Sequence, residues 1–387
     1  MELKDDFSES LKNPLFKVVT DEAKSIGVKA YLIGGFVRDH LLGRKDIKDI
    51  DIVAIGSGIE LAKAVQKKLK DAKPVKIFKT YGTAMIHWNE LEIEFVGSRK
   101  ESYSIETRNP KVESGSLEDD QNRRDFSINA LAISLNKVDF GTLLDPFNGI
   151  SDLKKKNLRT PLDPDITYSD DPLRMLRAIR FANQLDFIIE QKSLVSITKN
   201  SDRIKIVSKE RIVEELTKIL ATKKPSHGFI LLEETGLLKF ILPELVTLKG
   251  IDEIEGQRHK DNFYHTLEVV DNLCLNSNNI WLRWAALLHD IGKAKTKKFV
   301  PNIGWTFHNH EFIGSKMIYK IFKRLKMPLN DKIKFVQKMV LMSSRPIIIS
   351  EDHVTDSAIR RLLFDAGPFI DDLITPVSYT HLRAHET

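Results

Sequence analysis

The chain has 387 residues, which is long enough for two or three domains with a sizeable core. Its formal net charge of +6 and its pI near 9.0 suit a polyanionic partner. The single cysteine, Cys274, excludes an intrachain disulfide and a multi-cysteine zinc site, while the acidic N-terminus and the lack of a long apolar stretch predict a cytoplasmic protein without a membrane partner.

Short β-like runs separated by turns fill the chain from about residue 28 to 150. We expect strands at 30–33, 50–55, 75–78, 83–88, 91–96 and 130–134, and a helix at 59–70. Residues 109–122 are polar and acidic with little apolar periodicity, which indicates a mobile loop. Beyond about residue 150 the pattern is helical, with clear segments at 174–183, 210–221 and 226–234. The chain is therefore predicted to be α+β, with a mixed β-sheet head followed by an all-α remainder.

The densest cluster of functional signals lies at the start of the head. Gly34 and Gly35 end an apolar run and let backbone N–H groups approach an anion, and Arg38 follows within reach of a phosphate. Asp49 and Asp51 then share one face of the next strand, where two carboxylates can hold hard cations. A lone Gly-Gly or Asp-x-Asp is usually structural, but the combination predicts a metal-dependent nucleotidyl-transfer site.

Two later segments of the head could complete this site. Strand alternation places Glu92 and Glu94 on one face, so either could join the aspartates, unless both belong to a solvated strand face. The pair Arg123 and Arg124 precedes Asp125 at the start of an apolar run. This pattern suggests a phosphate clamp, or alternatively a charged turn with a capping aspartate.

The segment after residue 168 opens the helical part of the chain. Asp170 is predicted to be a helix N-cap, and Asp171 and Arg174 lie three residues apart on one face. An acceptor beside a forked donor can recognise the hydrogen-bonding edge of a base. Arg177 and Arg180 continue along the same flank and could reach a triphosphate, although an exposed salt-bridged helix face has the same pattern.

These motifs, in this order, resemble the tRNA nucleotidyltransferase (CCA-adding enzyme) and poly(A) polymerase family of polymerase-β-like nucleotidyltransferases. The likeness covers roughly residues 28 to 245. It implies that CTP or ATP is attacked by the 3′-hydroxyl of tRNA with the help of two Mg²⁺ ions. The implied roles are metal binding by Asp49 and Asp51 with Glu94 as third carboxylate, triphosphate binding by Gly34, Gly35, Arg38 and Arg124, base templating by Asp171 and Arg174, and phosphate or template contacts by Arg177 and Arg180.

A second set of motifs lies in the C-terminal third. Adjacent His289 and Asp290 on an apolar helix are hard to explain as core residues, because buried polar groups need partners and a metal supplies them. The set resembles the HD phosphohydrolase superfamily, which implies that a divalent metal, with a transition metal as a candidate, is bound by His265, His289, Asp290 and Asp356. His310 is a further candidate ligand. The alternative is an HD fold kept as an RNA-binding scaffold without turnover.

The predicted layout is a nucleotidyltransferase head over 1–150, a helical neck and body over 151–250, and an HD-type domain over 251–376. Residues 377–387 resemble a non-native tail, or else a short disordered terminus. The leading function is CCA addition to tRNA. Poly(A) synthesis, addition of C or A alone, a phosphohydrolase with a vestigial head and a non-catalytic RNA-binding protein remain as alternatives, and the oligomeric state is left open.

Overall fold

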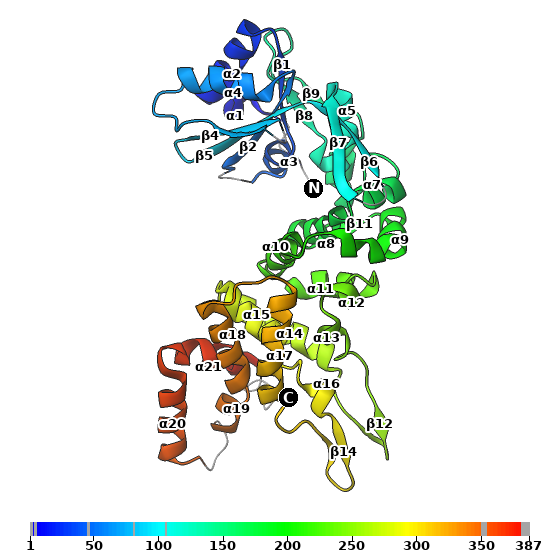
Figure 1. Ribbon diagram of the computed structural model, residues 1–387, viewed down its shortest axis with the longest axis vertical. Coiled ribbons are helices and arrows are strands. Elements are labelled where there is room, and N and C mark those ends of the chain that lie inside the picture. Colours follow the sequence, from blue (N-terminus) through cyan, green and yellow to red (C-terminus); the bar gives the residue numbers. More distant parts are fainter. Residues whose placement is uncertain are drawn as a thin grey trace. The chain divides into compact units, whose positions relative to one another are not determined.

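The computed structural model describes residue 3 and residues 6–44, 47–79, 82–104, 107–349 and 354–380; for 102–104, 107–111 and 376–380 it describes only the backbone. The chain forms two compact units, residues 1–174 with 187–197 and residues 175–186 with 198–387 (Figure 1). The helices α8 (Leu173–Leu185) and α9 (Gln191–Asn200) contribute residues to both units. Within the described residues, no helix is both long and apolar enough to cross a membrane.

A seven-stranded mixed sheet forms the framework of the first unit. Its strand order is β3-β4-β5-β2-β1-β8-β9, and only β2 and β5 pair in parallel among the neighbours (Figure 1). The strands are β1 (Lys29–Ile33), β2 (Asp49–Ile55), β3 (Lys76–Phe78), β4 (Thr83–Trp88), β5 (Leu91–Gly97), β8 (Ala132–Ser134) and β9 (Leu143–Leu144). The central strands are almost continuously apolar because both of their faces are covered.

Short helices connect and cover the strands of this sheet. They are α1 (Ser8–Leu11), α2 (Pro14–Ser25), α3 (Gly35–Leu41), α4 (Gly58–Lys68), α5 (Leu117–Asn122), η2 (Ser127–Asn129), α6 (Gly149–Lys155) and α7 (Pro164–Asp170). The helix α4 packs against β2, β4 and β5, and it begins where the Ser57 hydroxyl accepts a hydrogen bond from the Glu60 amide. A two-stranded parallel pair, β10 (Asn157–Leu158) and β11 (Ile188–Ile189), completes the unit.

The predicted strands and helices each coincide with an observed element to within two residues. The predicted loop at 109–122 is wrong. Strand β7 (Thr107–Ser114) pairs antiparallel with β6 (Arg99–Ser104), and α5 follows after a capping box between Ser116 and Asp119. A hairpin held by backbone hydrogen bonds needs no apolar alternation, and for that reason the segment escaped detection.

The second unit is largely helical and carries two small hairpins. Its helices are η3 (Ser201–Ile206), α10 (Lys209–Leu220), α11 (Pro225–Glu234), α12 (Leu238–Ile241), α13 (Pro243–Val246), α14 (Asn262–Cys274), α15 (Ile280–Leu288), α16 (Lys293–Thr296), α17 (His310–Arg324), α18 (Asp331–Met342), α19 (Arg345–Ile349), α20 (Asp356–Ala366), η4 (Gly367–Phe369) and α21 (Ile370–Thr380). The hairpins, which an all-α expectation did not include, are β12 (Glu253–Ile254) with β13 (Gln257–Arg258) and β14 (Lys298–Val300) with β15 (Gly304–Thr306). The helix α21 extends into the predicted tail as far as Thr380, and residues 381–387 lie outside the described part.

A buried arginine joins two helices of this unit. Arg283 lies in the apolar helix α15, where its guanidinium donates hydrogen bonds to the carbonyl oxygens of Leu220, Thr222 and Ser277. The first two carbonyls lie at the C-terminal end of α10, where helical acceptors lack intrahelical partners. The charge is therefore satisfied without a carboxylate, and α15 is fixed against α10.

Candidate active site

Three predicted carboxylates meet on the central strands of the head sheet. Asp49 and Asp51 lie two residues apart on β2, and the parallel pairing with β5 places Glu94 opposite Asp51 and Glu92 opposite Asp49. Asp51 is also paired in register with Ile33, the last residue of β1. The sheet therefore gathers the side chains at the end of β1, beside the two glycines.

The local electrostatics of these carboxylates favour a bound cation. Burial raises the pKa of Asp51, and the neighbouring Asp49 raises it further, while Arg124 only partly offsets these effects. Burial likewise raises the pKa of Glu94, with an added contribution from the charge of Asp51. Clustered oxygen ligands with raised pKa values suit a hard divalent cation such as Mg²⁺, which stabilises the ionised forms.

Gly34 fills a position that other residues would strain. Its φ is +79°, and a Cβ built there would lie 3.1 Å from Nη1 of Arg124 and 3.3 Å from Oδ2 of Asp51. The backbone between β1 and α3 thus approaches both a cation and a carboxylate of the candidate site. Gly35 is more open, since its nearest such neighbour is Nη2 of Arg38 at 3.7 Å.

The guanidinium of Arg38 is held by protein acceptors. It is buried, with Nε and Nη2 donating to the two carboxylate oxygens of Asp39 at 3.0 and 2.7 Å and Nη1 donating to Oδ1 of Asn129 at 2.7 Å. The amide nitrogen of Asn129 in turn donates to Oδ1 of Asp125 at 3.0 Å, and the same oxygen accepts the Phe126 amide at 2.9 Å. The side chain predicted to be an open fork for phosphate is therefore a buried cation in a hydrogen-bonded network.

Arg124 is positioned by a carboxylate that sequence reasoning missed. Asp120 is fully buried, and its Oδ2 accepts from Nε of Arg124 at 3.2 Å, while its Oδ1 accepts from Nε of Arg123 at 3.0 Å. Burial alone would raise the pKa of Asp120, but the two guanidinium groups outweigh it and hold the pKa below its ordinary value. The role of Asp120 could have been predicted from the sequence. It lies three and four residues before these arginines, which is the spacing of helical ion pairs.

The predicted base-recognition pair adjoins this arginine cluster. Nη2 of Arg174 donates to the carbonyl oxygen of Arg123 at 2.6 Å, and Arg174 lines a cavity of about 220 Å³ together with Asp170 and Arg123. The predicted N-cap at Asp170 is wrong, because Asp170 is the last residue of α7. Asp171 is extended, and its Oδ1 accepts the amide of Leu173 at 3.2 Å, because the proline that follows disfavours the helical conformation at residue 171.

The other two arginines of this segment belong to the second unit. Arg180 is buried, where Nε binds Oε2 of Glu215 at 2.6 Å and Nη1 donates to Gln184 at 2.8 Å. Its guanidinium also lies 3.9 Å from the ring centroid of Phe181, and that of Arg177 lies 5.4 Å from the same ring. Arg180 therefore serves the packing of α8 against α10.

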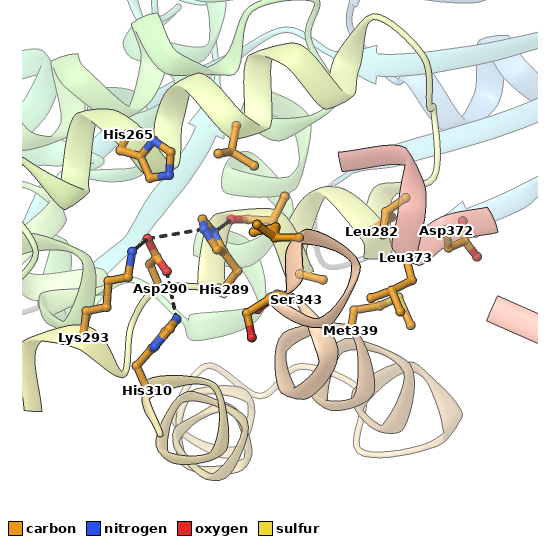
Figure 2. Close-up of a pocket in the computed structure, with 15 residues that line it drawn as sticks. His265, Leu282, His289, Asp290, Lys293, His310, Met339, Ser343, Asp372 and Leu373 are labelled. Carbon is orange, nitrogen blue, oxygen red and sulfur yellow. Dashed lines mark hydrogen bonds and ion pairs between the residues drawn. The ribbon is translucent and has the colours of Figure 1, made fainter. Parts of the chain in front are cut away.

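A second cluster forms in the helical unit. His265 lies on α14, His289 ends α15, and Asp290 follows directly; the ligand atoms of these three residues lie within 4.8 Å of one another (Figure 2). Oδ2 of Asp290 lies 3.3 Å from Nε2 of His289 and 2.7 Å from Nζ of Lys293, and Oδ1 lies 3.6 Å from Nε2 of His310 (Figure 2).

The protonation states in this cluster suit metal binding. Burial lowers the pKa of His265 to about 4, with help from His289. Burial would raise the pKa of Asp290, but His289 and Lys293 hold it well below the ordinary range. Nδ1 of His289 lies 2.8 Å from the carbonyl oxygen of Ala286, which can accept the Nδ1 proton and leave Nε2 for a metal when one is bound. Neutral imidazole and ionised carboxylate are the forms that bind a divalent metal.

The structure does not bring Asp356 to this cluster. Asp356 is exposed in the first turn of α20, where the cap of Thr355 starts the helix. The cavity of about 160 Å³ beside the cluster is lined instead by Asp372 of α21, together with His310 and the apolar side chains of Leu282 and Leu373 (Figure 2). His310, the weaker prediction, is therefore better placed than Asp356 to bind a metal at the cluster. Asp356 lies in the first turn of a helix, where a carboxylate can face solvent as readily as the protein interior.

Known proteins match the chain along most of its length. Sequence profiles match for the "Poly A polymerase head domain" over residues 30–159, the "Probable RNA and SrmB- binding site of polymerase A" over 186–248, and the "HD domain" over 262–366. The "Multifunctional CCA protein" of Shewanella frigidimarina (strain NCIMB 400) is 34% identical over 310 residues, which cover 78% of this chain and 70% of that protein. The chain belongs to the tRNA nucleotidyltransferase and poly(A) polymerase family.

Other members of the family agree with this placement. The "A-adding tRNA nucleotidyltransferase" of Aquifex aeolicus (strain VF5) is 42% identical over 300 residues, which cover 75% of this chain and 35% of that protein. The chain thus spans about a third of that relative's length. A solved structure of a tRNA nucleotidyltransferase complexed with a primer tRNA and an incoming ATP analog superposes with a TM-score of 0.65 at 26% identity, covering 95% of this chain and 98% of that one.

Proposed function

We propose that this family member is a cytoplasmic enzyme that adds CCA from CTP and ATP to the 3′ end of tRNA. The observation that carries the proposal is the register of β2 and β5, which sets Asp51 opposite Glu94 with Asp49 alongside. Family relatives named for CCA addition and a neighbouring structure with tRNA and an ATP analog support it. The three profile matches support the predicted head, body and HD-type regions.

Each group of residues has a proposed task. Asp49, Asp51 and Glu94 would hold Mg²⁺, which when bound supplies charge neutralisation and activation of the RNA hydroxyl. The backbone at Gly34 and Gly35 and the side chain of Arg124 would bind the triphosphate. We assign Arg38 to positioning, because its hydrogen bonds to Asp39 and Asn129 fix a buried positive charge that offsets part of the rise in the pKa of Asp51. Arg180 would likewise position α8, and Arg177 would contact phosphate.

Asp171 and Arg174 are proposed to recognise the incoming base. Replacing Arg174 with alanine is expected to lower kcat/KM for both CTP and ATP by about ten- to a hundredfold, as is typical for the loss of a paired donor to a base edge. The rate with each triphosphate measured separately would check this. Lys154→Ala in the same unit is the control, and an equal loss in that variant would contradict the assignment.

One alternative has specific support. Because the Aquifex relative is named A-adding, this chain could add only the terminal A. Incubation of tRNA lacking its 3′ end, and of tRNA ending in CC, with each radiolabelled triphosphate separately would decide. CCA addition predicts growth of the first substrate with CTP, whereas A addition alone predicts growth of only the second with ATP.

The cluster in the helical unit supports a second proposed activity, the hydrolysis of phosphoesters. His265, His289 and Asp290, with His310, would hold a divalent transition metal, whose chemistry when bound is the activation of water. Lys293 at 2.7 Å from Asp290 could orient a phosphate group. The competing role is that of a scaffold that binds RNA without turnover.

Metal binding at this cluster can be tested without assuming hydrolysis. After chelation, titration of the Asp51→Ala variant, which lacks a carboxylate of the proposed head metal site, with Mn²⁺ or Ni²⁺ is expected to raise its Tm, because a ligand that binds only the folded state stabilises it. His289→Ala should abolish that rise, and His227→Ala, outside the cluster, should retain it. A metal-dependent rise that persists in His289→Ala would contradict the ligand assignment.

A further inference from the structure

The two hairpins of the helical unit form a groove that the functions above leave unused. Strands β13 and β15 contact each other, and the cavity beside them has a volume of about 460 Å³. The first hairpin and the residues after it contribute Arg258 and Lys260, and the second contributes Trp305 and Phe307. Basic and aromatic side chains therefore line one open cavity.

The aromatic wall of this groove is fixed in place. Nε1 of Trp305 donates to the carbonyl oxygen of Gln257 at 3.1 Å, and the ring of His259 meets the indole edge-on at a centroid distance of 5.1 Å. The two hairpins also approach each other closely at Gly304, which has a φ of +93° and faces the side chain of Gln257. Trp305 is thus oriented before any ligand arrives, which reduces the entropy lost on binding.

The residues that line the groove carry positive charge. Among the ten described residues that line the groove, Arg258, Lys260 and Lys293 are cationic and none is acidic. Two of these cations are paired with carboxylates outside the lining, Arg258 with Glu253 and Lys293 with Asp290, and the nearby Asp252 is paired with Lys297. Cations interleaved with aromatic rings are the combination by which proteins hold single-stranded nucleic acid, through phosphate contacts and base stacking.

The groove is continuous with the histidine and aspartate cluster. His265 and Lys293 line both the groove and the smaller cavity beside the cluster. Nζ of Lys293 lies 2.7 Å from Oδ2 of Asp290 and 5.6 Å from the ring centroid of Phe307. A nucleotide stacked in the groove would therefore have its phosphate directed towards the cluster.

We propose that this hairpin groove, defined by Arg258, Lys260, Lys293, Trp305 and Phe307, binds the end of a single-stranded RNA and directs its phosphate to the His265–His289–Asp290 cluster. The proposal rests on the phosphoester hydrolysis proposed for this cluster and is independent of nucleotidyl transfer in the head. It assigns the cluster a substrate class, namely unpaired RNA ends in place of small phosphoesters.

Photo-crosslinking of the full chain tests the groove directly. The probe is pentauridylate carrying 4-thiouridine at its 3′ end, and crosslinked peptides are identified by mass spectrometry after trypsin digestion. The expected crosslink lies in the peptide Phe299–Lys316, which contains both aromatic residues of the groove. Charge reversal at Lys260 should lower this crosslink by about three- to tenfold, because one phosphate contact becomes repulsive.

The matched control reverses an equal charge outside the groove. Lys320→Glu lies on α17, is exposed and leaves the tryptic peptide unaltered, so it should change the crosslink by less than about twofold if only the groove matters. A crosslink absent from Phe299–Lys316, or lowered equally by both charge reversals, would overturn the proposal. Loss of addition by the unmodified chain with the crosslink intact would instead refute only the head function.

Discussion

Replacing Asp51 with alanine is expected to abolish nucleotide addition while RNA binding largely survives. The carboxylate of Asp51 is central to the proposed metal site, with Asp49 on the same strand and Glu94 directly opposite. Losing charge stabilisation aimed at the reacting phosphate should lower kcat by at least about a thousandfold. Single-turnover addition measures the first effect, and the fluorescence anisotropy of labelled tRNA measures the second, with a change in Kd below about threefold.

The same substitution should abolish activity without lowering the thermal stability of the protein. Because burial and like charge raise the pKa of Asp51, its ionised form is unfavourable in the metal-free protein. Asp51→Ala should therefore unfold at a Tm equal to or above that of the parent in EDTA. Glu90→Ala, an exposed carboxylate paired with Lys48, is the control and should keep full activity. An active Asp51→Ala protein would refute the metal assignment.

Replacing Asp120 with asparagine is expected to destabilise the head and weaken triphosphate binding together. Asp120 is fully buried between Arg123 and Arg124, so its neutralisation leaves two guanidinium groups without their carboxylate. Breaking a buried pair in this way typically costs about 3 kcal/mol of unfolding free energy. Arg124 also loses the contact that holds it beside Gly34, so KM for CTP should rise. Urea unfolding and steady-state kinetics measure the two effects.

The pH dependence of this loss follows from the direction of the shift. The folded pKa of Asp120 lies below its ordinary value of 3.8, so its contribution to stability is fully present above pH 3.8 and is lost as the pH falls through the folded pKa. The stability difference between parent and Asp120→Asn should thus be constant near neutrality and shrink in strong acid. Asp119→Asn, in the exposed capping box one residue earlier, should cost much less than Asp120→Asn. Equal losses in both variants would contradict the role of burial.

Much of the fold could be predicted because buried strands and helices have apolar patterns in the sequence. The apolar runs at 30–33 and 50–55 predicted β1 and β2, and the helical periods near 174–183 and 210–221 predicted α8 and α10. The hairpin β6–β7 could not be found in this way, since backbone hydrogen bonds hold it without an apolar stripe. The hairpins β12–β13 and β14–β15 have strands of only two or three residues, which are too short to show an alternating pattern.

The candidate site was predictable where its chemistry is local in sequence. Strand alternation alone placed Asp49 and Asp51 together, but only the parallel register selects Glu94 as the partner of Asp51. The partners of Arg38 and Arg124 depend on tertiary contacts, namely Asn129 and the burial of Asp120. Asp356 shows that a matching residue type is not sufficient. The residue type carries no information on whether the start of α20 faces the cluster.

The most direct test of the central claim is a crystal soaked with CTP and Mn²⁺, examined by the anomalous scattering of manganese. The account predicts manganese peaks at the carboxylates of Asp49 and Asp51, with the triphosphate beside Gly34 and Arg124. Manganese absent from these carboxylates, with CTP bound elsewhere in the chain, would contradict it.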